Sequence, residues 1–466
     1  MNPTEHNFSP AGTNEIDASC RVSLLALFGG AALWLVVGLA LGLIGAIKFH
    51  APEFLSGCPL LTYGRVAPAA NDAILYGFCI PAALGVLLWI FSRLSNAPLA
   101  LPIVPVVAAN LWHLGVFVGL AGILIGESTG HPWLEFPRAA AVLLFAAFLL
   151  IAVTAAATFG LREKREAYPS HWFLFAALLL FPWIYSTANL LLLGWPVRGV
   201  VQSIIGWWFA NNLVFIWLAL AGIGTAFYFL PKIANRPLAG SGYTLFAFFS
   251  LLLFGTWCGI PQGAPVPAWL PAASSFAATL TIMALAAISI VTRKTVGGAK
   301  VDCPSGSFGF IRFGMFAFIV SGLMYLLTAC PESSRVLEFT WFGPAQVQLQ
   351  LLGFFAMVMF GAIYHVLPRV MGFDLPFPKF AKAHLWISIL GVLLFVIPLA
   401  IGGVEQGMKL RDAAVPFADV NAAALKFLRV STTGQLLILL GALLFAVNLF
   451  AMTLKWKLAL LKSLIA

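Results

Sequence analysis

Between Arg21 and Lys48 the sequence reads VSLLALFGGAALWLVVGLALGLIGAI, a run from Val22 to Ile47 without a charged residue. A helix needs about 20 apolar residues to cross the hydrocarbon core of a bilayer. This run is long enough to span a membrane, and it is too long for the apolar part of a secretory signal peptide. We interpret it as a retained transmembrane helix, preceded by a cytoplasmic tail over residues 1–19.

Similar apolar runs recur along the whole chain, in which 61% of the 466 residues are hydrophobic and only 9% are charged. This composition lies outside the range of soluble globular proteins. Backbone groups in hydrocarbon must be hydrogen-bonded within the protein, and long runs without polar alternation favour helices over barrel strands. We predict an all-α integral membrane protein of about twelve transmembrane helices, in one domain over residues 20–457 with a short cytoplasmic tail over residues 458–466. The predicted helices begin near Cys20, Asn71, Ala100, Pro137, Ser170, Ile204, Tyr243, Trp269, Phe310, Gln346, His384 and Thr433.

The basic residues predict the orientation of these helices. Most of the 26 Lys and Arg fall on the side of the N-terminus when twelve helices are threaded through a bilayer. Basic residues near helix ends stay in the cytoplasm, so both termini are predicted to be cytoplasmic. The net charge of +10 is accounted for mostly by these helix ends, and nucleic acid is therefore not a predicted partner.

Stretches rich in Pro and Gly predict the connections between helices. We expect residues 51–68, 126–137 and 402–431 on the outer face and residues 231–242 on the inner face. The segment 402–431 is the longest and most polar of these loops. It is a candidate docking site for an extrinsic partner, with a merely solvated connection as the alternative.

Several short motifs occur in a characteristic order along the chain. They are LTYGRVAP at 61–68, GESTGHPWLEFPR at 126–138, WWFANN at 207–212, FYFLPK at 227–232, PVPAW at 265–269, IYHVLPR at 363–369, GG at 402–403 and QG at 406–407. Together they make the chain resemble subunit I of the C-family (cbb-class) heme-copper oxygen reductases over nearly its whole length. The resemblance implies a heme-copper oxidase subunit I-like bundle in a bacterial-type inner membrane.

The resemblance also implies six histidine ligands for heme b and copper, because imidazole suits both iron and copper. The positions that match these ligands hold other residues here. The heme-ligand positions fall on Ala70, Gln346 and Gln348, the copper-ligand positions on Asn211, Pro261 and Gln262, and the redox tyrosine position on Ser321. We therefore predict no heme and no copper.

The histidine count supports this expectation without any alignment. The chain has seven His. His6, His50, His131 and His171 are expected in tails or loops, which leaves His113, His365 and His384 in or near helices. Three are too few for six ligand places. The six Cys show no CxxC or CxxCH spacing, so neither a zinc site nor an attached c-type heme is indicated.

Other polar residues in the spans have functional and structural interpretations. His113 and Asn110 form a candidate polar relay, with a hydrogen-bonded structural His113 as the alternative. His365 and His384 are expected to anchor cytoplasmic helix ends. Because Glu127 and Glu135 are expected at outer helix ends and no acid is expected deep in a span, no proton-pumping relay is predicted.

The amides in the spans need partners in hydrocarbon. We expect an interhelical hydrogen-bond network where ligands would stand, with a bound molecule such as a quinone as the rival interpretation. The amides concerned are Asn211, Asn212, Gln346, Gln348 and Gln350. An empty heme site would be costly, so Phe354, Phe355 and Phe360, or lipid, are expected to fill it.

Three functions remain open from the sequence. The first is a cofactor-free homologue that acts as a structural or assembly subunit, with a membrane-anchored c-type cytochrome or other respiratory subunits as partners. The second is an active oxygen or nitric oxide reductase whose ligands lie elsewhere. The third is a binding protein for quinone or another small apolar ligand.

Overall fold

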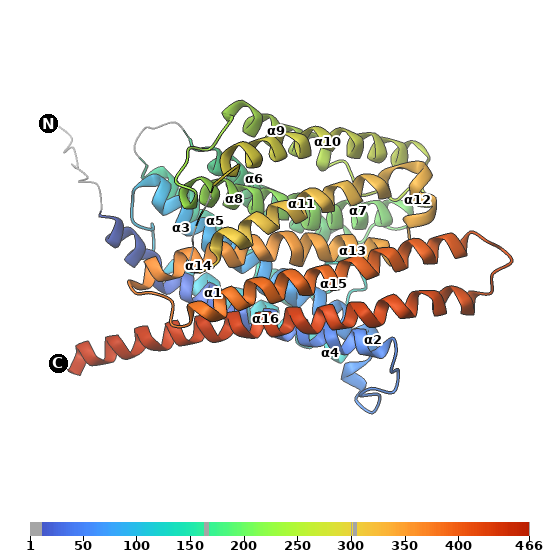
Figure 1. The fold of residues 1–466 in the computed structure, drawn as a ribbon, viewed down its shortest axis with the longest axis horizontal. Helices are drawn as coiled ribbons and strands as arrows, with labels where there is room; N and C mark the ends of the chain where they lie inside the picture. Colours follow the sequence, from blue (N-terminus) through green and yellow to red (C-terminus); the bar gives the residue numbers. More distant parts are fainter. Residues whose placement is uncertain (1–11, 163–166, 300, 302–304, 466) are drawn as a thin grey trace.

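The computed structural model describes residues 12–162, 167–299, 301 and 305–465. The described chain is helical, and eleven of its helical segments are long and apolar enough to cross a membrane. Together with the shorter apolar helix α9 (Ser241–Gly255), they confirm a multi-pass bundle of about twelve helices. The helices run side by side along the long axis of the molecule (Figure 1).

The helical elements follow one another in a simple order. The first half contains α1 (Thr13–Lys48), the short η1 (Pro59–Leu61), α2 (Tyr63–Asp72), η2 (Ala73–Cys79), α3 (Ile80–Ser95), α4 (Val104–Ile125), α5 (Arg138–Gly160), α6 (Pro169–Ala188), η3 (Asn189–Gly194), α7 (Val200–Asn211), η4 (Asn212–Trp217) and α8 (Leu218–Ile233). After α9 come α10 (Trp269–Val296), α11 (Ser307–Ala329), α12 (Pro331–Leu337), α13 (Phe342–Gln348), η5 (Leu349–Ala356), α14 (Met357–Met371), α15 (Pro378–Leu410) and α16 (Phe417–Ile465).

Three spans form the centre of the bundle. The most apolar windows of Tyr63–Ser95, Val200–Ile233 and Phe342–Met371 are 100%, 94% and 89% buried, whereas the windows of the other spans are at most 50% buried. A helix that is apolar all round and buried all round belongs to the core, and a half-buried apolar helix faces lipid. The three central spans are also the ones that carry Ala70, Asn211 and Gln348.

The prediction of a long polar loop over residues 402–431 is wrong. Helix α15 continues to Leu410 and α16 begins at Phe417, so the two form a long hairpin that projects beyond the neighbouring helices (Figure 1). The glycines that suggested a loop serve helix packing instead. A Cβ at Gly403 would lie 2.1 Å from the backbone nitrogen of Phe342. Small residues allow this close approach between membrane helices.

Helix α1 begins, and is already buried, several residues before the predicted start of the first span. The helix begins at Thr13, inside the predicted tail, and residues 1–11 lie outside the described part. Asp17 is 4% exposed and accepts hydrogen bonds from Trp89 Nε1 at 2.8 Å and Arg93 Nε at 2.9 Å. This ion pair fastens α1 to α3. At the other end, α16 remains helical through the predicted tail as far as Ile465.

Two histidines lie deeper than the sequence suggested. His384 was expected at a membrane interface, but its side chain is fully buried and Tyr364 Oη lies 3.1 Å from its Nδ1. His171 was expected in a loop, but it is the third residue of α6 and packs against Phe91 and Phe159. Hydropathy misplaced both because each sits near the beginning of a helix whose start is packed against neighbouring helices.

Candidate functional site: the heme and copper positions

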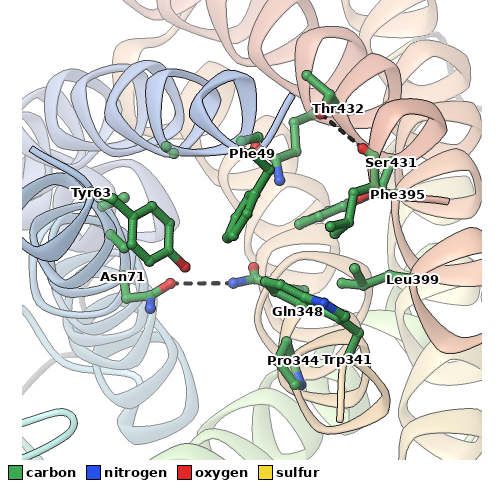
Figure 2. A pocket seen from close by; sticks show the side chains of 17 residues that line it. Phe49, Tyr63, Asn71, Trp341, Pro344, Gln348, Phe395, Leu399, Ser431 and Thr432 are labelled. Carbon is green, nitrogen blue, oxygen red and sulfur yellow. Dashed lines mark hydrogen bonds between the residues drawn. The ribbon is translucent and has the colours of Figure 1, made fainter. Parts of the chain in front are cut away.

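The heme-ligand positions Ala70 and Gln348 line one cavity of about 200 Å³. Ala70 comes from α2, and Gln348 is the last residue of α13. Gln348 Nε2 donates a hydrogen bond to Asn71 Oδ1 at 3.2 Å (Figure 2). The space is below the range of several hundred Å³ that ligand pockets usually occupy. These two positions therefore line one small cavity, and the hydrogen bond between Gln348 and Asn71 lies within it.

Aromatic and hydroxyl side chains complete this cavity. The ring of Phe49 packs against Tyr63 at 4.8 Å and against Trp341 at 5.0 Å between centroids. Helix α16 adds Ser431, Thr432 and Gln435 to the lining. In the described structure, Gln348 Oε1 is buried without a hydrogen-bond partner. The cavity thus offers several hydrogen-bonding groups inside an aromatic frame.

The copper position Asn211 is closed by direct contacts. Asn211 Nδ2 donates to the carbonyl oxygen of Gly255 at 3.0 Å, and its Oδ1 accepts from Tyr325 Oη at 2.8 Å. Gly259 has φ +103°, and a Cβ there would lie 2.4 Å from Asn211 Cβ. The remaining cavity beside Asn211 measures about 50 Å³. Both ends of the amide are therefore satisfied in a tightly packed place.

A thiol lies beside the same amide. Cys258 follows α9 and lines the small cavity with Asn211 and Tyr325. Burial raises the pKa of the Cys258 thiol to about 12, and the neighbouring Tyr325 phenol opposes this shift only in part. The thiol donates to the carbonyl oxygen of Phe254 at 3.3 Å. Metal-binding cysteine is the thiolate. Cys258 is therefore a protonated, packed thiol in this environment.

The neighbouring copper positions Pro261 and Gln262 lie in the connection from α9 to α10. The backbone N–H of Gln262 donates to Glu338 Oε1 at 2.6 Å, and its side-chain Nε2 donates to the carbonyl of Pro271 at 3.0 Å. The Gln262 side-chain amide is thus bonded to the first turn of α10, and Asn211 is bonded to Gly255 and Tyr325. The hydrogen bonds found in the described residues do not link the two positions.

The remaining amides do not form the single network that was expected. Asn212 Nδ2 donates to backbone carbonyls of Trp208 and Thr256, at 2.9 and 3.1 Å. Gln350 Nε2 reaches the carbonyl of Phe215 only at 3.5 Å. Gln346 is 4% exposed and its Nε2 has no partner among the described residues. Asn212 and Gln350 thus donate to backbone carbonyls near them, and none of these three amides is hydrogen-bonded to another amide in the described part of the chain.

Three of these positions are followed, at once or within a few residues, by a π-helical segment. The π-helical segments η2, η4 and η5 begin shortly after Ala70, directly after Asn211 and directly after Gln348. Such i→i+5 turns are rare and occur often at functional sites. They widen the helix and re-aim the side chains on either side. This backbone feature lies beside each of the three positions although the ligand residues themselves are different.

Bulky side chains pack the core near these positions. Phe354 and Phe355 are fully buried and Phe360 is 4% exposed. A Cβ at Gly222 would lie 2.4 Å from the ring of Phe354. The absence of a side chain at this residue of α8 therefore leaves room for that ring. Phe360 packs against Phe78 with ring centroids 5.2 Å apart. The three phenylalanines are therefore core residues, and none of them lines the cavity at Ala70.

His113 and Asn110 are not joined as a relay. His113 Nε2 lies 3.2 Å from the carbonyl oxygen of Ala26 on α1, and its ring fills the space above Gly30. Asn110 is exposed on the lipid-facing side and donates to the carbonyl of Val106 in its own helix at 2.8 Å. The contact with a neighbouring helix agrees with the structural interpretation of His113.

The residues present do not fit heme or copper. A methyl group, a proline ring and carboxamides occupy the positions that the sequence motifs match to ligands, and amides are poor ligands for iron. The described residues contain no group of three or more His, Cys, Asp or Glu arranged to hold a metal ion.

Sequence reasoning missed two buried acids, Asp17 in the first span and Asp72 in the second. The second helix was predicted to begin near Asn71, which would put Asp72 at its edge. The second span begins at Tyr63 instead, and the Asp72 side chain is fully buried. Its neighbour is Glu135, from the connection between α4 and α5. The statement that no acid lies inside a span is therefore wrong. An Asp within a long apolar run was the signal that could have found it.

Comparisons with known proteins agree on the family. The model of the family Cytochrome C and Quinol oxidase polypeptide I matches residues 23–437. The Cbb3-type cytochrome c oxidase subunit CcoN1 of Stutzerimonas stutzeri is 22% identical over 440 residues, covering 90% of each chain. Cytochrome c oxidase subunit 1 of Rhodobacter capsulatus is 24% identical over 480 residues, covering 95% of this chain and 86% of the relative.

A solved structure shows the same fold. It is a heme-copper terminal oxidase dimer determined by cryo-EM, with a TM-score of 0.68 at 14% identity. The match covers 92% of this chain and 84% of the other. Because the family model spans most of the chain, the chain belongs to the cytochrome c and quinol oxidase polypeptide I family, the subunit I proteins of heme-copper oxidases.

Proposed function

We propose that this chain is a cofactor-free member of the oxidase subunit I family that acts as a structural or assembly subunit of a respiratory membrane complex. The observation that carries the proposal is the Asn211 site. Its amide is bonded at both ends, to Tyr325 and Gly255, and is packed against Gly259. A copper-ligand position arranged in this way serves packing between helices rather than metal binding.

The histidines argue against an active oxygen or nitric oxide reductase. The structure places four in membrane-spanning segments, namely His113, His171, His365 and His384. Each of them lies in a different span. His113 already lies within hydrogen-bonding distance of the carbonyl oxygen of Ala26, and His384 within that of the Tyr364 hydroxyl. Six ligand places cannot be filled from this set.

The partner we propose is a membrane-anchored c-type cytochrome or another respiratory subunit in a bacterial-type inner membrane, with both termini in the cytoplasm. The relatives are themselves described as cytochrome c oxidase subunits. The α15–α16 hairpin offers a projecting surface whose two helices are tied by an ion pair of 3.0 Å between Lys426 and Glu405. Close packing of helices in lipid can persist after the core chemistry has changed.

The proposal is tested by purification of the full chain from its native membrane in mild detergent. We expect no Soret band and no stoichiometric copper in the isolated chain, and a larger assembly with respiratory subunits on native electrophoresis with mass spectrometry. A stoichiometric b-type heme bound to this chain would overturn the cofactor-free assignment. A stable monomer without copurifying subunits would overturn the assembly role.

The orientation is tested separately by cysteine labelling. A cysteine placed at Asp412, in the turn of the α15–α16 hairpin, should react with an impermeant reagent from the outer side. One placed at Asp374, between α14 and α15, should react only after the membrane is opened. The opposite pattern would reverse the proposed topology.

A second function is favoured by the cavity at Ala70. Its amides and hydroxyls, with a Gln348 Oε1 that has no partner among the described residues, suit the hydrogen-bonding head group of a quinone or a lipid, whose tail would lie outside this small cavity. The test is mass spectrometry of organic extracts from the purified chain and from an Ala70→Phe variant that fills the cavity. A molecule that is retained by the wild type and lost in the variant would support this function, and equal retention would refute it.

A further inference from the structure

Asp72 is buried inside the second membrane-spanning segment. None of its side chain is exposed, and neither carboxylate oxygen receives a hydrogen bond from an N–H or hydroxyl donor in the described part of the chain. A lone carboxylate in such a place is so unfavourable that a buried acid binds a proton instead. The burial of Asp72 therefore requires a partner that can share a proton.

The geometry supplies that partner in Glu135. Tyr76, one turn after Asp72, donates from its phenol to the carbonyl oxygen of Trp133 at 2.6 Å. The Tyr76 ring also packs against Phe136 with centroids 5.1 Å apart. The face of the helix that carries Asp72 is thus covered by residues 133–136, and the carboxyl groups of Asp72 and Glu135 lie within hydrogen-bonding reach of each other.

The segment that presents Glu135 is held in a defined shape. Thr129 Oγ1 donates to the carbonyl of Leu134 at 2.7 Å, and the Thr129 N–H donates to the carbonyl of Glu135 at 3.1 Å. Leu134 and Phe136, on either side of the acid, are each 3% exposed. These contacts hold the backbone around Glu135, whose carboxyl group lies beside Asp72 of α2.

The groups around the pair are neutral. The phenols of Tyr76 and Tyr185 face it, with ring centroids 6.1 Å apart. On α2, Arg65 donates instead to the carbonyls of Pro59 and Leu124. Arg138 at the start of α5 is exposed.

The helices packed against α2 bring no neutralising base to the pair among their described residues. On α4 the titratable side chain is His113, which bonds to Ala26. On α1 the basic residues are Arg21, bonded to the carbonyl of Val370, and Lys48, bonded to that of Phe54. Burial raises the pKa of Glu135 to about 7.

We propose that Asp72 and Glu135 share one proton, and that this proton latches the 126–137 segment onto α2 as a pH-sensitive contact. The protonated acid donates a hydrogen bond to an oxygen of the other, ionised carboxylate. Such charge-assisted hydrogen bonds are stronger than those between two neutral groups. The pair then carries one negative charge. Loss of the shared proton leaves two like charges facing each other in a site of low polarity, which opens the contact.

The sign of the pH dependence follows from the raised pKa of Glu135. The folded pair holds a proton that the unfolded chain releases near the ordinary carboxyl value of 4.5. The stabilisation is therefore complete at acidic pH and is lost as the pH rises through about 7.

The test measures thermal unfolding of the full-length protein in detergent from acidic to alkaline pH. We expect the unfolding midpoint of the wild type to fall by several degrees as the pH rises from about 4.5 through about 7. In an Asp72→Asn variant the amide donates to ionised Glu135 at every pH, so this fall should become smaller, although burial still raises the pKa of Glu135. A Glu135→Gln variant tests the same proton from the loop side, and Glu127→Gln in the same segment is the matched control that should keep the wild-type profile.

Infrared spectroscopy gives a second readout. Between about pH 4.5 and 7, where ordinary carboxyl groups are ionised, a band from a protonated carboxyl group should be present in the wild type and weaker in the Asp72→Asn variant. An unchanged pH profile in both folded variants would overturn the proposal. Stabilisation of the wild type by calcium ions at alkaline pH, lost in Asp72→Asn, would also overturn it, because the pair would then bind a cation in place of a proton.

Discussion

The cavity at Ala70 and the site at Asn211 both contain positions that the sequence motifs match to the family's ligands, yet they are built differently. At Asn211 both ends of the amide are hydrogen-bonded, and about 50 Å³ remains free. At Ala70 about 200 Å³ remains, and Gln348 Oε1 has no partner among the described residues. The first site has become packed core, whereas the second keeps room for a bound molecule.

The physical reason for the difference lies in the replacing side chains. Asn211 sits opposite Gly259 and Tyr325, so two neighbouring elements can close on its short amide. Ala70 is too small to reach across its space, and Gln348 bonds only to Asn71. Buried polar networks stabilise a core when every member is satisfied and weaken it when one is left without a partner.

The largest effect is expected from Gly259→Ala. A Cβ there would lie 2.4 Å from Asn211 Cβ, and φ +103° is unfavourable for any residue with a side chain. We expect a loss of about 3 kcal/mol or more from the sum of strain and overpacking. Thermal unfolding in detergent measures it, with Gly372→Ala as control because Gly372 has φ +77° and open space. Equal effects of the two changes would show that the Asn211 site is not tightly closed.

A smaller effect is expected from Tyr325→Phe. The change removes the donor to Asn211 Oδ1 and leaves a buried amide oxygen unpaired, which costs about 1–3 kcal/mol. Tyr243→Phe, at a tyrosine that is 47% exposed, is the control and should be nearly neutral. If Tyr325→Phe were neutral as well, water would have to reach Asn211, and the contrast between the two sites would fail.

Gln348→Leu should cost less than Tyr325→Phe. It removes one hydrogen bond of 3.2 Å, worth roughly 0.5–1.5 kcal/mol, and it also removes the unpartnered Oε1. The same unfolding assay compares the two variants, and Asn71→Leu probes the other end of the bond. A larger loss at Gln348 than at Tyr325 would mean that the cavity, and not the Asn211 site, holds the bundle together.

The smallest effect concerns His113, which lies in neither site. His113→Gln can keep a hydrogen bond to the carbonyl of Ala26, whereas His113→Leu loses it, so the two should differ by about 1 kcal/mol or less. Unfolding midpoints and assembly with partner subunits are both measured. Equal loss of assembly in two stably folded variants would contradict the structural role and indicate a relay.

The sequence determined the bundle and its family because these depend on local composition and on motif order. Apolar runs long enough to span a bilayer must be helical, whatever they pack against. The shortage of histidines was also decided by counting, since seven residues scattered over tails and separate helices cannot supply six clustered ligands.

Tertiary structure alone decided which polar groups meet. Asn71 and Gln348 are 277 residues apart, and Asn211 and Tyr325 are 114 apart, so neither pair has a local pattern. Gly403 looked like part of a loop until its backbone contact with Phe342 showed a helix packed closely against another. Hydropathy put Asp72 at the edge of a helix because it reports only how apolar a run of residues is. The burial of Asp72 depends instead on which other helices cover this residue.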